Sequence, residues 1–172
     1  MINVLICGAT GFIGRNLVNF FSSKSDFNVF AIYNKKKQFK SDQNINNITW
    51  IKADLLNDSE VQGIFKRASI DVVIQAAATT SGAKDIVTRP YIHVTDNAIM
   101  NSLLLRQSME SCVKHFIFFS CSVMYKNSHI ALKESDWDPS DPINEKYFGA
   151  AHTKLYIEKM LEFYSIISNM KT

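Results

Sequence analysis

The chain has 172 residues, of which 47% are hydrophobic and 20% are charged, which is the balance of an ordinary globular protein with one core. A net charge of +3 is too small to predict a nucleic-acid surface, and no apolar run is long enough to span a bilayer. The three cysteines form no spaced pattern, so we expect no disulfide framework. The N-terminus carries no basic leader, so we expect no signal peptide and a cytoplasmic protein.

In chain order, apolar runs that predict strands alternate with segments at helical spacing. Strands are expected at 2–7, 27–33, 48–52, 71–76 and 115–120. Helices are expected at 15–21, from 58 to about 68, at 90–111 and from about 143 to 167, with loops at 35–47, 79–89 and 136–142. Alternating strands and helices give right-handed βαβ units, so the sequence predicts an α/β fold with a doubly wound parallel sheet in three αβα layers, as a single domain over 1–172.

A glycine-rich turn joins the first predicted strand to the first predicted helix. Gly8, Gly11 and Gly14 recur there at every third residue. Glycine lets the backbone turn sharply and approach a ligand, and a helix start offers free N–H groups and a partial positive charge to a pyrophosphate. This order predicts a Rossmann-type dinucleotide site, with the other strand ends converging on one cleft. The residues between the glycines that we expect to line it are Thr10, Phe12 and Ile13.

The choice between the two nicotinamide cofactors depends on the end of the second predicted strand. A carboxylate there, about twenty residues after the last glycine, binds a ribose 2′-hydroxyl and repels a 2′-phosphate. That position holds the uncharged Asn34, followed by Lys35, Lys36 and Lys37, while Arg15 follows the glycine turn. Cations here attract a 2′-phosphate, so the sequence favours NADP over NAD. The alternative is that the lysines form a solvated loop.

The glycine turn and three later segments together resemble the extended short-chain dehydrogenase/reductase family, whose members include the NAD(P)-dependent epimerases, dehydratases and reductases of nucleotide sugars. GDP-fucose synthase-like enzymes look nearest. The later segments are Ala53-Asp54-Leu55, Gln75-Ala76-Ala77-Ala78 and residues 113–125. The resemblance implies that Asp54 and Leu55 contact the adenine, that the small residues Ala76, Ala77 and Ala78 lie under the nicotinamide ribose, and that Asn97 on the long helix contacts the cofactor.

The resemblance also implies hydride transfer at a sugar carbon, assisted by a Tyr-xxx-Lys pair and a Ser or Thr. Lys154 matches the family's lysine, which also holds the nicotinamide ribose, but Ala150 stands where the family has its tyrosine. Tyr147 is the candidate replacement if the helix starts after it; otherwise it is a packing residue. The Ser or Thr position falls on Cys121, whose thiol is a weak donor. Cys121 and its neighbour Ser122 are both candidates, and Ser122 is favoured.

We therefore expect the NAD(P)-binding domain of a nucleotide-sugar epimerase, dehydratase or reductase, with the dinucleotide and, in full-length relatives, a nucleotide sugar as ligands. Such relatives continue into a substrate domain, which we expect this chain to lack. The alternatives are a non-catalytic dinucleotide-binding module or truncated remnant, and a reductase of the atypical short-chain kind. The four histidines are scattered and predict no metal site, and His152 is a less favoured proton donor. A possible homodimer contact is formed by apolar residues that could instead face the sheet, namely Ile99, Leu103, Leu104, Ile157, Leu161 and Tyr164.

Overall fold

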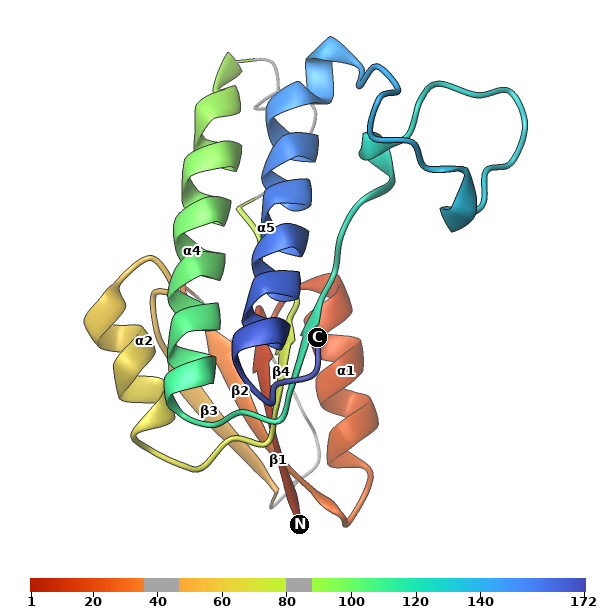
Figure 1. Cartoon of the computed structure of the whole chain (residues 1–172). Coiled ribbons are helices and arrows are strands. Elements are labelled where there is room, and N and C mark those ends of the chain that lie inside the picture. The colour runs from red at the N-terminus through yellow and green to blue at the C-terminus, as the bar shows by residue number, and fades with distance from the viewer. Residues whose placement is uncertain (36–46, 80–87) are drawn as a thin grey trace.

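A five-stranded parallel sheet forms the centre of the computed structural model, which describes residues 1–35, 47–79 and 88–172 (Figure 1). Its strands are β1 (Ile2–Cys7), β2 (Phe27–Tyr33), β3 (Ile48–Lys52), β4 (Val72–Gln75) and β5 (His115–Phe118). They lie in the order β3-β2-β1-β4-β5, so the chain moves outward from β1 and then crosses back to β4. This order confirms the predicted doubly wound fold and puts its switch point between β1 and β4.

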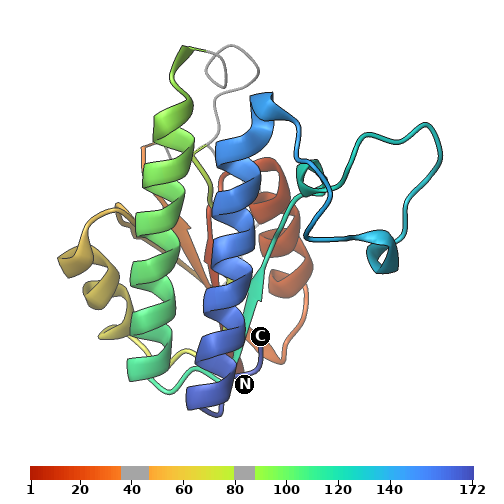
Figure 2. The ribbon, with the colours of Figure 1, turned by 45° about the horizontal axis from the view of Figure 1, so that its top comes forward.

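Helices in the described part of the chain cover both faces of the sheet. Helix α1 (Phe12–Ser22) lies on one face, and α2 (Asp58–Phe65), α4 (Pro90–Glu110) and α5 (Phe148–Ile167) lie on the other (Figures 1 and 2). Right-handed crossovers explain this division, because outward and returning connections place their helices on opposite faces. Helices α4 and α5 pack side by side, and a Cβ on Gly149 would lie 2.8 Å from Val94 Cγ2. None of the helices described is long and apolar enough to cross a membrane.

Each face of the sheet has its own apolar core. The larger core lies under α2, α4 and α5 and contains Phe116, Ile32 and Leu104. The smaller one lies under α1 and contains Val18 and Val29. Because both faces of the central strands are buried, they appear in the sequence as continuous apolar runs without polar alternation.

The last helix begins later than predicted. We expected it from about residue 143, but a 3₁₀ turn, η3 (Glu145–Tyr147), comes first and α5 starts at Phe148. The Asn144 side chain accepts a hydrogen bond from the Lys146 N–H at 3.0 Å, which closes this separate turn. Short 3₁₀ turns, η1 (Ser122–Met124) and η2 (Glu134–Asp136), also interrupt the segment before it. The loops predicted at 35–47 and 79–89 lie largely outside the described residues.

Several residues that we predicted to form a dimer face point inward instead. Leu104, Ile157 and Leu161 are buried in the core beneath α4 and α5. Helical spacing alone does not separate an inner face from an outer one when a helix is apolar on more than one side. The exposed apolar side chains on these two helices are Tyr91, Ile99, Phe148, Tyr156, Phe163, Ile166 and Ile167.

Candidate functional site

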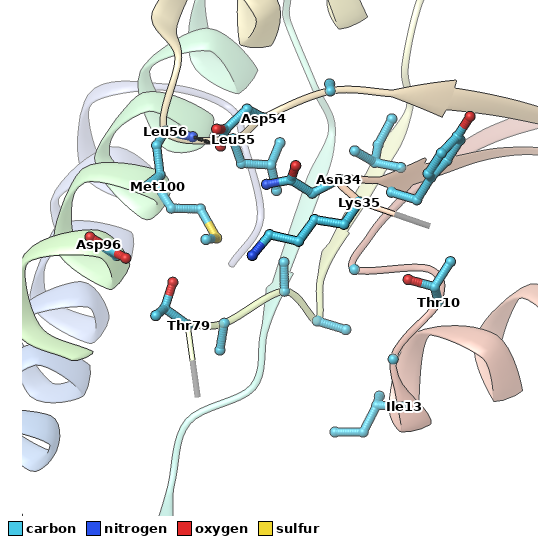
Figure 3. Close-up of a pocket in the computed structure, with 18 of the residues that line it drawn as sticks. Thr10, Ile13, Asn34, Lys35, Asp54, Leu55, Leu56, Thr79, Asp96 and Met100 are labelled. Carbon is cyan, nitrogen blue, oxygen red and sulfur yellow. Dashed lines mark hydrogen bonds between the residues drawn. The ribbon is translucent and has the colours of Figure 1, made fainter. Parts of the chain in front are cut away.

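A cleft of about 1170 Å³ lies at the carboxyl ends of β1 to β4, where a doubly wound sheet binds its ligands (Figure 3). It is lined by most of the residues that the sequence predicted to bind the cofactor. These are Gly8, Thr10, Gly11, Phe12, Ile13, Asn34, Lys35, Asp54, Leu55, Ala76, Ala77 and Ala78.

Three glycines form the floor where β1 turns into α1. Gly8 has a φ of +70°, and a Cβ on it would lie 2.7 Å from the Ala77 Cα. A Cβ on Gly14 would lie 2.1 Å from the Gly8 carbonyl oxygen, although Gly14 itself does not line the cleft. Gly11 donates its N–H to the same oxygen at 2.9 Å. The backbone therefore packs too closely for side chains, and the chain itself forms the surface that faces a ligand.

The start of α1 has no side-chain cap, so its first N–H groups can bind a ligand. Helix α2 is capped by Asn57, whose side chain accepts from the Ser59 and Glu60 N–H groups. By contrast, the N-cap of α1 is Gly11, which has no side chain to accept these N–H groups. The first N–H groups of a helix have no partner within it, and the helix dipole makes this end favourable for an anion. Phe12 and Ile13 lie at this end and line the cleft.

Of the basic residues that we expected to attract a 2′-phosphate, Lys35 and Arg15 lie in different places in the structure. Lys35 lines the cleft and, with Asn34, extends into the space between Asp54 and Thr79 (Figure 3). Arg15 is exposed, with its guanidinium carbon 5.6 Å from the centre of the Phe12 ring, and does not line the cleft. Lys36 and Lys37 lie outside the described residues.

Asp54 holds the turn after β3 in place. Its carboxylate accepts the Leu56 N–H at 3.0 Å, and its own N–H donates to the Glu60 carboxylate at 2.8 Å. These bonds fix the carboxylate beside Leu56, across the cleft from Thr10 and Ile13 (Figure 3).

Asn97 does not line the cleft, and the direct cofactor contact that we expected of it stays a prediction. Its Oδ1 accepts the Thr79 N–H at 3.0 Å, and its Nδ2 donates to the carbonyls of Thr79 and His93 at 3.2 and 2.6 Å. Thr79 does line the cleft. Asn97 therefore acts on the wall of the cleft through Thr79.

Sequence reasoning missed the contribution of α4. Further lining residues are Ile32, Tyr33, Ala53, Leu56, Thr79, Arg89, Ile92, Asp96 and Met100. Those from 89 to 100 recur at intervals of three and four, so they form one stripe on the first turns of α4. That spacing, on a helix that follows a strand at the carboxyl edge, is the signal by which they could have been found.

Three of the predicted catalytic residues, Lys154, Cys121 and Ser122, lie near the end of β5, and neither they nor Tyr147 line this cleft. Lys154 on α5 donates from Nζ to the Phe119 carbonyl at 2.6 Å, and Nζ lies 4.3 Å from the centre of the Phe118 ring. Burial lowers the pKa of Lys154, and the neighbouring Cys121 and Glu158 oppose that shift. The amine is therefore held against the end of the strand.

Cys121 and Ser122, the two candidates for the hydroxyl position, differ in their surroundings, because the charge of Lys154 acts on the Cys121 thiol. Burial raises the pKa of the Cys121 thiol, while the Val123 N–H and the charge of Lys154 act in the opposite direction. Ser122 is exposed. Cys121 has an extended backbone, in which successive side chains point to opposite sides.

Tyr147 is a candidate only if the last helix starts after it, and α5 does begin at the next residue, Phe148. Its ring is partly exposed and lies 5.6 Å from the Lys146 Nζ. His152 is on a different side of α5 from Lys154, because two residues turn a helix by roughly 200°. Its Nδ1 bonds to the Phe148 carbonyl at 2.9 Å, which ties it to the outer surface.

Comparisons with known proteins agree on one family. Residues 4–170 match the model of the NAD dependent epimerase/dehydratase family. The chain is 31% identical to the UDP-glucose 4-epimerase of Halalkalibacterium halodurans, over 93% of this chain and 45% of the relative. Curated relatives that it matches are two to three times longer, since the chain covers 33% to 48% of their length.

Solved structures show the same fold. The UDP-glucose 4-epimerase of Thermus thermophilus in complex with NAD superposes with a TM-score of 0.81 at 20% identity, over 98% of this chain and 52% of that one. A GDP-mannoheptose C4 reductase from Campylobacter jejuni with NADP bound gives a TM-score of 0.77 at 20% identity, over 98% and 48%.

Proposed function

The chain belongs to the NAD dependent epimerase/dehydratase family, and from that premise we propose that it is the NAD(P)-binding part of an enzyme that moves a hydride at a carbon of a nucleotide sugar. The observation that carries this proposal is the glycine floor, where Gly8 and Gly11 bring bare backbone to the cleft and Gly14 lets the uncapped start of α1 pack against Gly8. Such a floor suits a pyrophosphate, whose charge needs N–H donors at close range.

The other lining residues assign the two halves of the dinucleotide. Asp54 and Leu55 lie beyond β3 and suit the adenosine half, because a carboxylate accepts hydrogen bonds from an amino group. The wall after β4 and the end of β5, where Lys154 lies, suit the nicotinamide half. When bound, the nicotinamide supplies or accepts the hydride.

We further propose that NADP is preferred to NAD. Support comes from the uncharged Asn34 at the end of β2 and from Lys35 in the cleft, because an ammonium there attracts a 2′-phosphate. Titration of the chain with NADPH and NADH tests this, and NADPH is expected to bind more tightly. Lys35→Glu should weaken NADPH binding by about tenfold or more and leave NADH nearly unchanged. Arg15→Glu is the matched control, because Arg15 is a cation outside the cleft lining.

If neither cofactor binds below millimolar concentration, the proposed function fails. If Arg15→Glu rather than Lys35→Glu removes the preference for NADPH, the 2′-phosphate has been assigned to the wrong cation.

A second candidate function, dinucleotide binding without catalysis, is favoured by Ala150. A methyl group neither transfers a proton nor donates a hydrogen bond to a sugar. Turnover of a nucleotide sugar by the chain, with and without Tyr147→Phe, separates the two functions. Tight NADPH binding without turnover supports the binding module, and turnover that Tyr147→Phe does not change removes Tyr147 from the chemistry.

We also propose that two copies associate through the outer surfaces of α4 and α5. Phe163, Ile166 and Ile167 leave apolar area in water there, and covering it is favourable. Light scattering of the purified chain is expected to give twice its mass, and Phe163→Glu should return it to the monomer.

A further inference from the structure

A chain of buried side-chain amides lies beneath the wall of the cleft that follows β4. Gln75 and Asn101 are each 1% exposed, and Asn97 is 7% exposed. Gln75 donates from Nε2 to Asn101 Oδ1 at 3.2 Å. Asn101 in turn donates from Nδ2 to the main-chain carbonyl of Asn97 at 2.7 Å. Burying an amide costs free energy unless it is hydrogen-bonded, and each of these is bonded on both its donor and its acceptor side.

The two ends of this amide chain bond to the backbone of the wall at 76–79, one to Ala77 and the other to Thr79. At one end, Gln75 Oε1 accepts the Ala77 N–H at 3.1 Å. At the other, the Asn97 amide accepts the Thr79 N–H and donates to the Thr79 carbonyl. The Ala76 N–H is taken by the Cys7 carbonyl at 3.2 Å. Three of the wall's N–H groups are therefore used inside the protein.

This arrangement gives the two sides of the cleft different chemistry. The start of α1 offers N–H donors to an anion, whereas the wall at 76–79 offers mainly methyl groups and has few donors left. An uncharged, hydroxyl-bearing group suits such a wall better than a phosphate does.

We propose that Gln75 and Asn101 are positioning residues for the nicotinamide half of the dinucleotide, acting through the wall at 76–79. The proposal rests on the proposed function. The amide chain bonds neither to the start of α1 nor to Asp54 in the described structure, although Ala77 of the wall packs against Gly8. Its loss should therefore loosen the surface for the nicotinamide half more than the surfaces for the adenosine half and the pyrophosphate.

Two substitutions that conserve volume test the proposal in the full chain. Gln75→Met and Asn101→Leu remove the amides, and each variant is titrated with NADPH and with 2′,5′-ADP, which carries the adenosine half alone. We expect the Kd for NADPH to rise by about tenfold and the Kd for 2′,5′-ADP to stay within about twofold, because a wall that is ordered for only part of the time lowers apparent affinity in proportion.

Ser108→Ala is the matched control. Ser108 is also a buried polar residue of α4, but its hydroxyl has no hydrogen-bond partner in the described structure, so neither Kd should change. If Gln75→Met raises both Kd values by the same factor, the amide chain has a general structural role and the proposal is overturned.

The two proposals fail in different ways. If the parent chain binds neither ligand, the proposed function fails first. If it binds both and the variants bind both equally well, the positioning role alone is wrong. Should Gln75→Met not fold, Asn101→Leu carries the same test, because it removes the acceptor that holds the Gln75 amide in position.

Discussion

The packing of the glycine floor predicts a large and specific effect of Gly14→Ala. The new Cβ would meet the Gly8 carbonyl oxygen at 2.1 Å, whereas ordinary contact begins at 3.4 Å. The start of α1 and the end of β1 would therefore have to separate by about 1.3 Å, an overpacking that costs about 1–3 kcal/mol of the free energy of unfolding. The same movement takes the helix start away from the cleft, so the Kd for NADPH should rise by at least about a hundredfold.

Gly63→Ala is the control for this prediction. Gly63 lies within α2, and nothing lies within 4 Å of its added Cβ. Alanine is the better helix former, so this variant should gain about 0.5–1 kcal/mol and bind NADPH like the parent. Urea unfolding followed by circular dichroism gives the stabilities, and calorimetric titration gives the affinities. Unchanged stability and affinity in Gly14→Ala would refute the close packing on which the site is built.

Three further predictions concern stability. Cys112 has a φ of 56° at the end of α4, so Cys112→Gly should raise the free energy of unfolding in urea by about 1 kcal/mol, while Cys112→Ala, which keeps a Cβ, gains nothing. The hydrogen bond from Lys114 lowers the pKa of Asp71, so its stabilising contribution is complete above the ordinary value near 4 and is lost as the pH falls through the lower folded value. The difference in melting temperature between the parent and Asp71→Asn should then shrink between pH 7 and pH 2, and a constant difference would contradict the assignment. Leu104→Ala should cost about 2–5 kcal/mol because Leu104 is fully buried, whereas Ile99→Ala on the outer side of α4 should cost far less.

Features of the fold that depend on neighbouring residues could be predicted from the sequence. The strands could be predicted because both their faces are buried and they appear as apolar runs. The glycine floor could be predicted because a strand, a glycine turn and a helix follow one another directly. The start of α5 could not be predicted in this way. The Lys146 N–H donates to the Asn144 side chain, and this single bond favours a separate turn over a longer helix.

Features that depend on contacts between distant segments were harder to predict. The sequence placed Asn97 correctly on a helix near the site, but its partner Thr79 is 18 residues away, and only the folded chain shows that its amide is fully used there. The choice between Cys121 and Ser122 depends on contacts with Lys154 on another element, and it stays a prediction. The inner and outer faces of α4 and α5 likewise became clear only through their packing on the sheet.

Binding and chemistry make different demands on this chain. Binding at the glycine floor needs only the right backbone geometry, and the glycines supply that geometry within a few residues. Proton transfer needs a donor at a fixed distance from Lys154, yet a methyl group stands at Ala150, a thiol at Cys121, and the lysine's amine is bonded to the Phe119 carbonyl. A bound cofactor that competes for that amine would have to replace a 2.6 Å charge-assisted bond. Cofactor affinity in Lys154→Met therefore measures whether this lysine contributes to binding at all, which has to be known before any turnover is attributed to it.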